Sequence, residues 1–213
     1  MRKKPEKQIG LFGGSFDPPH CGHVALVQAG LAMGLDSVWV IPARPVHREL
    51  SGLADAEMRL AWVQQIFADL TRVQVMDWEI RRQCPTASIE TLEQFHDADP
   101  KTVPWLMLGA DAWVGLPDWR AYPAHRDLCN IAVFARRGIA VETVCGHAGW
   151  QRLALSDIDD CNQAGNWTYI QADLPDISAT RIRSDAMQGK SLHGLVPNMV
   201  QRQIEQAYGT ARE

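Results

Sequence analysis

The sequence predicts an α/β protein built on a Rossmann-like, doubly wound parallel sheet with helices on both faces. Short apolar runs alternate along the chain with segments in which apolar residues recur at helical spacing. The runs are almost entirely apolar, which is typical of parallel strands covered on both sides. With 213 residues, the chain is expected to form a single domain over residues 1–213.

Six apolar runs are the expected strands, and turn-forming residues end several of them. The first run stops at the pair Gly13-Gly14, the second at Pro42 and the fourth at Gly109. In chain order, the expected strands cover residues 9–12, 37–41, 73–76, 105–109, 130–135 and 168–171.

Five segments with helical character lie between or after these strands. The first begins near Cys21 and ends at Gly34, because glycine readily adopts the backbone that closes a helix. The fourth begins at Ser178, and the fifth has Pro197 in its first turn, where proline is favoured. In chain order, the expected helices cover residues 22–33, 55–68, 88–96, 178–187 and 197–208.

Polar loops follow five of the expected strands. Because ligands of such sheets bind at the carboxyl ends of the strands, where the strand order reverses, we expect these loops to form one site. They cover residues 13–23, 42–48, 109–119, 136–137 and 175–183.

The loop after the first strand reads Gly-Gly-Ser-Phe-Asp-Pro-Pro-His-Cys-Gly-His over residues 13–23. Gly13 and Gly14 permit backbone angles closed to other residues and leave no side chain in the way. Gly22 lets a bulky group lie against the start of the next helix, which is a site for phosphate. His20 and His23 add two imidazole donors. The loop lacks the G-K-[ST] pattern of Walker loops and the G-x-G-x-x-G pattern of dinucleotide-binding loops. It therefore predicts a nucleotide phosphate site that differs from both.

Three segments carry a resemblance to a known family. Residues 15–23 resemble the [ST]-F-D-P-x-H-x-G-H signature of the nucleotidylyltransferase superfamily, and with the glycine pair and His20 they resemble its bacterial-type nicotinate mononucleotide adenylyltransferases. Residues 177–183 (ISATRIR) resemble the second phosphate motif, [IV]-S-[SA]-T-x-[IL]-R. Residues 109–111 and 116–119 resemble the segment G-x-D…L-P-x-W. The resemblance extends from about residue 9 to residue 208.

The resemblance implies that AMP is transferred from ATP to nicotinate mononucleotide, giving deamido-NAD and pyrophosphate in NAD biosynthesis. It implies catalytic roles for His20, His23 and Arg183, with Mg²⁺ arriving on ATP and no dedicated protein ligand for the metal. The implied ATP-binding residues are Gly13, Gly14, Ser15, Phe16, His20, Gly22, His23, Gly109, Asp111, Arg136, Ile177, Ser178, Thr180 and Arg183. The implied residues for the second substrate are Gly14, Ser15, Arg48, Ser88 and Trp119.

Structural interpretations of the same residues stay open. Ser178 and Asp111 could simply cap helices, and Trp119 could belong to the core. Arg48 could be a surface charge, and Arg181 is expected to face solvent.

Ala87 stands where the family commonly has tyrosine, which leaves the preference for an acid or an amide acceptor open. The alternatives are therefore transfer to nicotinamide mononucleotide or another acceptor, and a nucleotide sensor without catalysis.

Composition narrows the class of protein. A net charge of −4 does not favour nucleic-acid binding, and no apolar run is long enough for a membrane helix. The five cysteines are scattered without a C-x-x-C pair, which favours a reducing compartment and a cytoplasmic location. Residues 1–8 are expected to be a flexible tail and residues 178–213 a helical part carrying the second motif. The sequence leaves open whether the protein forms a homo-oligomer.

Overall fold

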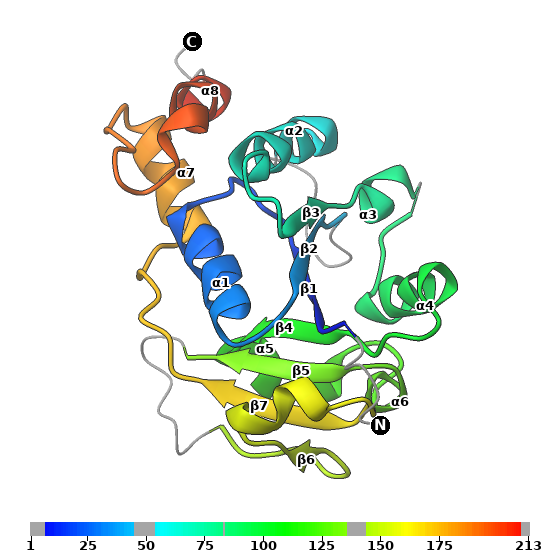
Figure 1. Cartoon of the computed structure of the whole chain (residues 1–213). Helices are drawn as coiled ribbons and strands as arrows, with labels where there is room; N and C mark the ends of the chain where they lie inside the picture. The colour runs from blue at the N-terminus through cyan, green and yellow to red at the C-terminus, as the bar shows by residue number, and fades with distance from the viewer. Residues whose placement is uncertain (1–6, 45–53, 83, 136–143, 210–213) are drawn as a thin grey trace.

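The structure, a computed structural model, describes residues 7–44, 54–82, 84–135 and 144–209. Within these ranges, seven parallel strands form one sheet in the order β3-β2-β1-β4-β5-β7-β6 (Figure 1). The strand order reverses between β1 and β4, as the doubly wound fold requires. The strands are β1 (Ile9–Gly14), β2 (Ser37–Pro42), β3 (Val73–Val75), β4 (Trp105–Gly109), β5 (Asn130–Phe134), β6 (Gln151–Arg152) and β7 (Asn166–Ile170).

All five expected helices are present near their predicted limits. These are α1 (Cys21–Ala32), α2 (Ala56–Phe67), α4 (Ser88–Ala98), α7 (Ala179–Met187) and α8 (Asn198–Gly209). Gly34, with φ +116°, follows the end of α1, and the side chain of Asp55 caps α2 by accepting from Glu57 N at 2.9 Å. Shorter elements were not predicted: α3 (Trp78–Arg81), α5 (Ala110–Val114), η1 (Leu116–Asp118), α6 (His125–Leu128), η3 (Leu155–Asp160) and strand β6.

Two hydrophobic cores lie on the two faces of the sheet, as predicted. Alternate residues of each central strand enter different cores: in β4, Trp105 and Met107 pack with α1, α2, α7 and α8, whereas Leu106 and Leu108 pack with α4 and α5. Figure 1 shows α1 and α4 on opposite sides of the strands. The carboxyl ends of β1, β2 and β4 are therefore held between two packed layers.

The glycine pair after the first predicted strand behaves differently from the prediction. Gly13 and Gly14 are the last residues of β1 and pair with Ile41 and Pro42 of β2, so neither needs a left-handed backbone. The positive φ, +45°, falls instead on Phe16, whose ring is fully buried against Phe12. The chain therefore turns after the glycines.

The predicted flexible tail does not include Gln8. This residue is 3% exposed, its backbone N–H donates to Asp36 Oδ2 at 2.8 Å, and its side chain accepts from Trp105 Nε1 at 2.7 Å. Residues 1–6 lie outside the described residues. No helix in the described ranges has the length and apolar character needed to cross a membrane.

Candidate active site

The two predicted histidines lie together at the start of α1. His20 is the N-cap residue of α1, its backbone N–H donates to His23 Nδ1 at 3.1 Å, and the two imidazole rings stack with centroids 3.6 Å apart. Because Nδ1 of His23 accepts this bond, the proton of the neutral ring resides on Nε2, which makes Nε2 a hydrogen-bond donor.

Gly22 is needed for a specific reason. A Cβ atom at this position would lie 3.0 Å from the His20 ring and 3.6 Å from the carbonyl oxygen of Pro175. Glycine therefore lets the His20 ring lie against the first turn of α1, a structural reason for Gly22 beside its predicted contact with ATP.

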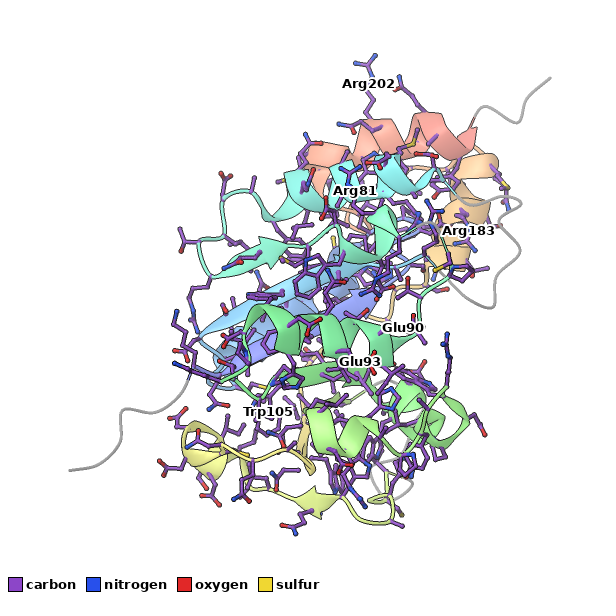
Figure 2. The ribbon with its side chains drawn as sticks, turned by 90° about the vertical axis from the view of Figure 1, so that its right-hand side faces the viewer. Arg81, Glu90, Glu93, Trp105, Arg183 and Arg202 are labelled. Carbon is purple, nitrogen blue, oxygen red and sulfur yellow. The ribbon has the colours of Figure 1, made fainter. Side chains whose placement is uncertain are left out.

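The second motif meets the first through an ion pair. Nη1 of Arg183, on α7, lies 3.3 Å from Oδ2 of Asp17 and also donates to the backbone oxygen of Asp17 at 2.5 Å. Nη2 of Arg183 donates to Thr180 Oγ1 at 3.3 Å. Figure 2 shows Arg183 on α7 and Glu90 on α4 toward the same edge of the molecule. The two motifs, distant in sequence, therefore meet at one end of the sheet.

Asp17 is the centre of this junction, and its side chain is fully buried. Besides Arg183, the carboxylate accepts from Tyr208 Oη at 2.6 Å and from Ala54 N at 2.9 Å. Burial of the phenol, together with its hydrogen bond to Asp17, raises the pKa of Tyr208. A single carboxylate therefore connects the first motif to the start of α2, to α7 and to α8.

A second buried charge holds the loops that follow β1 and β2. Arg59, on α2, is 2% exposed and donates to the backbone oxygens of Ser15, of Ala43 at 2.9 Å and of Ala54 at 3.2 Å. Burial lowers the pKa of Arg59, and these carbonyl oxygens compensate for the lost hydration of its guanidinium.

A cavity of about 760 Å³ opens beside the glycine pair at the carboxyl ends of β1 and β4. It brings together five residues that the sequence assigned to substrate or ATP: Gly13, Gly14, Ser15, Ser88 and Trp119. The remaining lining residues are Ala43, Glu79, Thr86, Ala87, Leu106, Leu108, Gly115, Asp118 and Arg120. Among the described residues other than its two chain neighbours, none has an atom within 4 Å of a Cβ built on Gly13, so a ligand can approach this backbone closely.

Trp119 lines the cavity and also packs against the hydrophobic core that contains α4 and α5. It follows η1, is partly exposed and meets the buried ring of His125 edge-on, with centroids 6.0 Å apart. The next residue, Arg120, pairs with Glu90 of α4 at 2.8 Å. This ion pair joins the segment that carries Trp119 to the helix that carries Ser88.

A buried carboxylate also lines the cavity. Glu79, on α3, is 5% exposed, lines the cavity and accepts from Thr91 Oγ1 at 2.7 Å. Burial is the main cause that raises the pKa of Glu79.

Asp111 lies in the first turn of α5, directly after β4, and does not line this cavity. A Cβ on Gly109 would lie 2.7 Å from Asp111 Oδ1, so the glycine lets the carboxylate fold back over the end of the strand.

Ser178 is the N-cap residue of α7, without a capping bond from its side chain. Arg181 faces solvent as expected, with 73% of its side chain exposed.

Sequence reasoning missed several residues that build the site. Asp17 stood within the first motif, but its partners could not be read from the chain. Arg59 carried no signal except a charged residue inside a predicted helix, and Glu79 and His125 lie in short helices that were not predicted. Arg48 and Arg136, which the sequence assigned to the site, lie outside the described residues.

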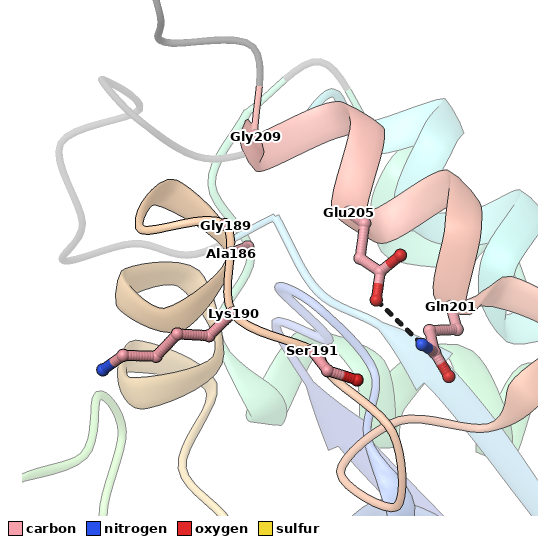
Figure 3. A pocket seen from close by; sticks show the side chains of 7 residues that line it. All are labelled: Ala186, Gly189, Lys190, Ser191, Gln201, Glu205 and Gly209. Atoms are coloured by element: carbon pink, nitrogen blue, oxygen red, sulfur yellow. Dashed lines mark hydrogen bonds between the residues drawn. The ribbon is translucent and has the colours of Figure 1, made fainter.

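Another cavity, of about 460 Å³, lies between α7 and α8 (Figure 3). Several of its polar groups already have partners: Gln201 Nε2 donates to Glu205 Oε1 at 2.8 Å, Leu192 N donates to the same oxygen at 3.3 Å, and Lys190 Nζ donates to Asp185 Oδ1 at 3.1 Å. None of the predicted site residues that the structure describes lines this cavity. Among the described residues, no group of three or more His, Cys, Asp or Glu side chains could hold a metal ion.

Comparison with known proteins agrees with this geometry. The cytidylyltransferase-like family matches residues 11–185. A "probable nicotinate-nucleotide adenylyltransferase" of Pseudomonas aeruginosa is 35% identical over 208 residues, which are 93% of this chain and 95% of the relative. The protein of the same name in Thermotoga maritima is 32% identical over 209 residues, which are 95% of this chain and 93% of the relative.

A solved structure is similar in fold. The Plasmodium falciparum nicotinic acid mononucleotide adenylyltransferase complexed with NaAD has a TM-score of 0.73 at 16% sequence identity, covering 94% of this chain and 96% of that one. The chain therefore belongs to the cytidylyltransferase-like family of nucleotidyltransferases, alongside relatives named as nicotinate-nucleotide adenylyltransferases.

Proposed function

We propose that this protein transfers the adenylyl group of ATP to nicotinate mononucleotide, forming deamido-NAD and pyrophosphate in NAD biosynthesis. The phosphate of the mononucleotide attacks the α-phosphorus in line, the bond between the α- and β-phosphates breaks, and pyrophosphate leaves. The observation that carries the proposal is the contact between the two phosphate motifs, through Asp17 and Arg183, beside a cavity walled by Trp119.

ATP would occupy the junction of the two motifs. We assign the α-phosphate to His20, His23 and the amides at the start of α1, and the outer phosphates to the start of α7 with Ser178 and Thr180. Arg183 is already oriented by Asp17, and a planar guanidinium suits phosphate oxygens. Asp111 and Arg136 are assigned to the nucleoside part of ATP.

No protein base is required, because the attacking phosphate is already an anion. Catalysis would come from alignment and from stabilisation of the charge that develops on the phosphates. The Nε2–H group of His23, fixed by the bond that Nδ1 accepts, suits this role.

Nicotinate mononucleotide would occupy the cavity beside Gly14 and Ser15. The face of Trp119 suits stacking with a cationic pyridine ring. We assign the nicotinate carboxylate to Ser88 and the phosphate to Arg48.

Mg²⁺ is proposed to arrive on the triphosphate of ATP, with phosphate oxygens and water as ligands, because Mg²⁺ keeps several waters and is usually bound through substrate phosphates. The metal would neutralise part of the negative charge on the phosphates. A cytoplasmic location is also proposed, supported by five free cysteines and testable by fractionation.

The test is pyrophosphate release from Mg-ATP with nicotinate mononucleotide, nicotinamide mononucleotide or phosphopantetheine as acceptor. We expect release with the first and a product that contains both nucleotides. Release only with another acceptor would replace the proposed substrate, and release with none would favour a sensor. His23→Ala should lower kcat at least a hundredfold while the unfolding midpoint stays close to that of the wild type.

A further inference from the structure

A buried histidine contacts the cavity residue assigned to the nicotinate carboxylate. His125, the first residue of α6, is fully buried, and its Nε2 lies 2.9 Å from Ser88 Oγ. Ser88 is the first residue of α4 and lines the cavity together with Trp119. His125 was not assigned any role by the sequence motifs.

The protonation state of His125 follows from its surroundings. Burial lowers the pKa of His125, so the ring is neutral and carries one proton, on either Nε2 or Nδ1. Nδ1 is buried and has no hydrogen-bond partner within the described part of the chain. A proton on Nδ1 would therefore be a buried donor without an acceptor, an arrangement that is rarer in proteins than an acceptor without a donor.

The position of this proton decides what Ser88 offers to the cavity. A serine hydroxyl has one proton and two lone pairs. If His125 donates from Nε2, Ser88 Oγ accepts, and the hydroxyl proton remains available for an acceptor in the cavity. If His125 instead accepted at Nε2, the hydroxyl proton would be used on the histidine.

We propose that His125 is a positioning residue that holds Ser88 as a hydrogen-bond donor toward the acid group of the acceptor substrate, and thereby favours nicotinate over nicotinamide mononucleotide. This inference rests on the proposed function. The hydroxyl can donate to the carboxylate of nicotinate or to the carbonyl oxygen of nicotinamide, but the bond to the carboxylate is charge-assisted and roughly twice as strong as the neutral bond to the amide. The pair Ser88–His125 supplies this polar contact next to Ala87, which also lines the cavity.

The kinetic test measures kcat/KM with each mononucleotide and compares their ratio. Ser88→Ala and His125→Leu are each expected to lower the nicotinate-to-nicotinamide ratio about tenfold, as the loss of one bond to a charged group would do. Because the two residues act as one unit, the nicotinate-to-nicotinamide ratio of the double variant should be no lower than that of either single variant.

Two further variants separate positioning from packing. His125→Gln keeps an N–H donor near the position of Nε2 and is expected to retain the ratio within about threefold. His96→Leu is the matched control: Nε2 of His96, on α4, contacts Leu128 O of α6 at 2.8 Å, away from the cavity, and its loss should leave the ratio unchanged.

Nitrogen-15 NMR of histidine-labelled wild-type protein reads the tautomer directly, with the His125 signals identified by their absence from the spectrum of His125→Leu. We expect the proton on Nε2. A proton on Nδ1, or an unchanged ratio in active Ser88→Ala and His125→Leu variants, would overturn the positioning role alone. Absence of transfer to either mononucleotide by the wild-type protein would overturn the proposed function as well.

Discussion

Replacing Asp17 with alanine should destabilise the protein far more than a typical substitution in a ligand-binding loop. The change removes the acceptor of Tyr208 Oη and Ala54 N and leaves the guanidinium of Arg183 without its carboxylate. A hydrogen bond to a charged group contributes about 1.5–3 kcal/mol, and breaking a buried ion pair costs about 3–5 kcal/mol. Because these contributions overlap, we expect a loss of about 4 kcal/mol in the free energy of unfolding.

Urea denaturation followed by circular dichroism measures this loss. Tyr208→Phe removes one of the three contacts and should cost about 1.5–2 kcal/mol. The cost of the double variant Asp17→Ala/Tyr208→Phe should be smaller than the sum of the two single costs by about 1–2 kcal/mol, since Tyr208 has already lost its partner once Asp17 is absent.

Asp127→Ala is the control, because this carboxylate is on the surface, with 72% of its side chain exposed, and should change stability by less than about 0.5 kcal/mol. A cost below about 1 kcal/mol for Asp17→Ala would refute the view that this carboxylate joins the two motifs.

Three other substitutions test separate parts of the structure. Gly10→Ala would place a Cβ 2.7 Å from both Leu35 Cδ1 and Met107 Sδ, two buried side chains, and should cost about 1–3 kcal/mol in urea denaturation; an unchanged midpoint would contradict this packing. His125 has a pKa lowered by burial, so the unfolded chain binds a proton that the folded chain does not, and stability is lost as pH falls below about 6.5. Unfolding at pH 7.5 and 5.5 should therefore show a smaller acid loss for His125→Leu than for the wild type, and equal losses would contradict a neutral buried ring. Trp119→Ala should raise KM for the mononucleotide about tenfold with kcat/KM for ATP nearly unchanged, and an equal effect on both substrates would argue against stacking.

The order of the six predicted strands and five predicted helices could be read from the sequence because each of these elements has a local signal. The apolar run at β1, the glycine after α1 and Pro42 at the end of β2 all act within a few residues of the features they determine. The two-residue strand β6 had no such signal: it pairs with β7 through Gln151 and Asn166, which are not apolar, so its existence depends on its neighbour.

The candidate site was predictable where a motif specifies backbone and ligand contacts, and much less so where it depends on contacts between distant segments. Ser88 and Trp119 were identified from separate segments, and the cavity joins them. Arg59 could not be identified, because its role lies in carbonyl oxygens of loops that follow two other elements. Such contacts depend on the packed fold, and a local pattern does not contain them.

Asp17 shows that a residue within a ligand-binding motif can serve the motif without being available to the ligand. Its carboxylate is fully buried and contacts Tyr208, Ala54 and Arg183, and Asp17 is not among the residues that line the cavity. An arginine that binds phosphate must be held in place before the phosphate arrives, or the cost of ordering it reduces affinity. Asp17 provides that order by tying Arg183 to the same loop that ends in His20 and His23. In the proposed function, the first motif thus carries side chains assigned to the phosphates together with the residue that aligns Arg183 of the second motif, so two motifs far apart in sequence would act on one triphosphate.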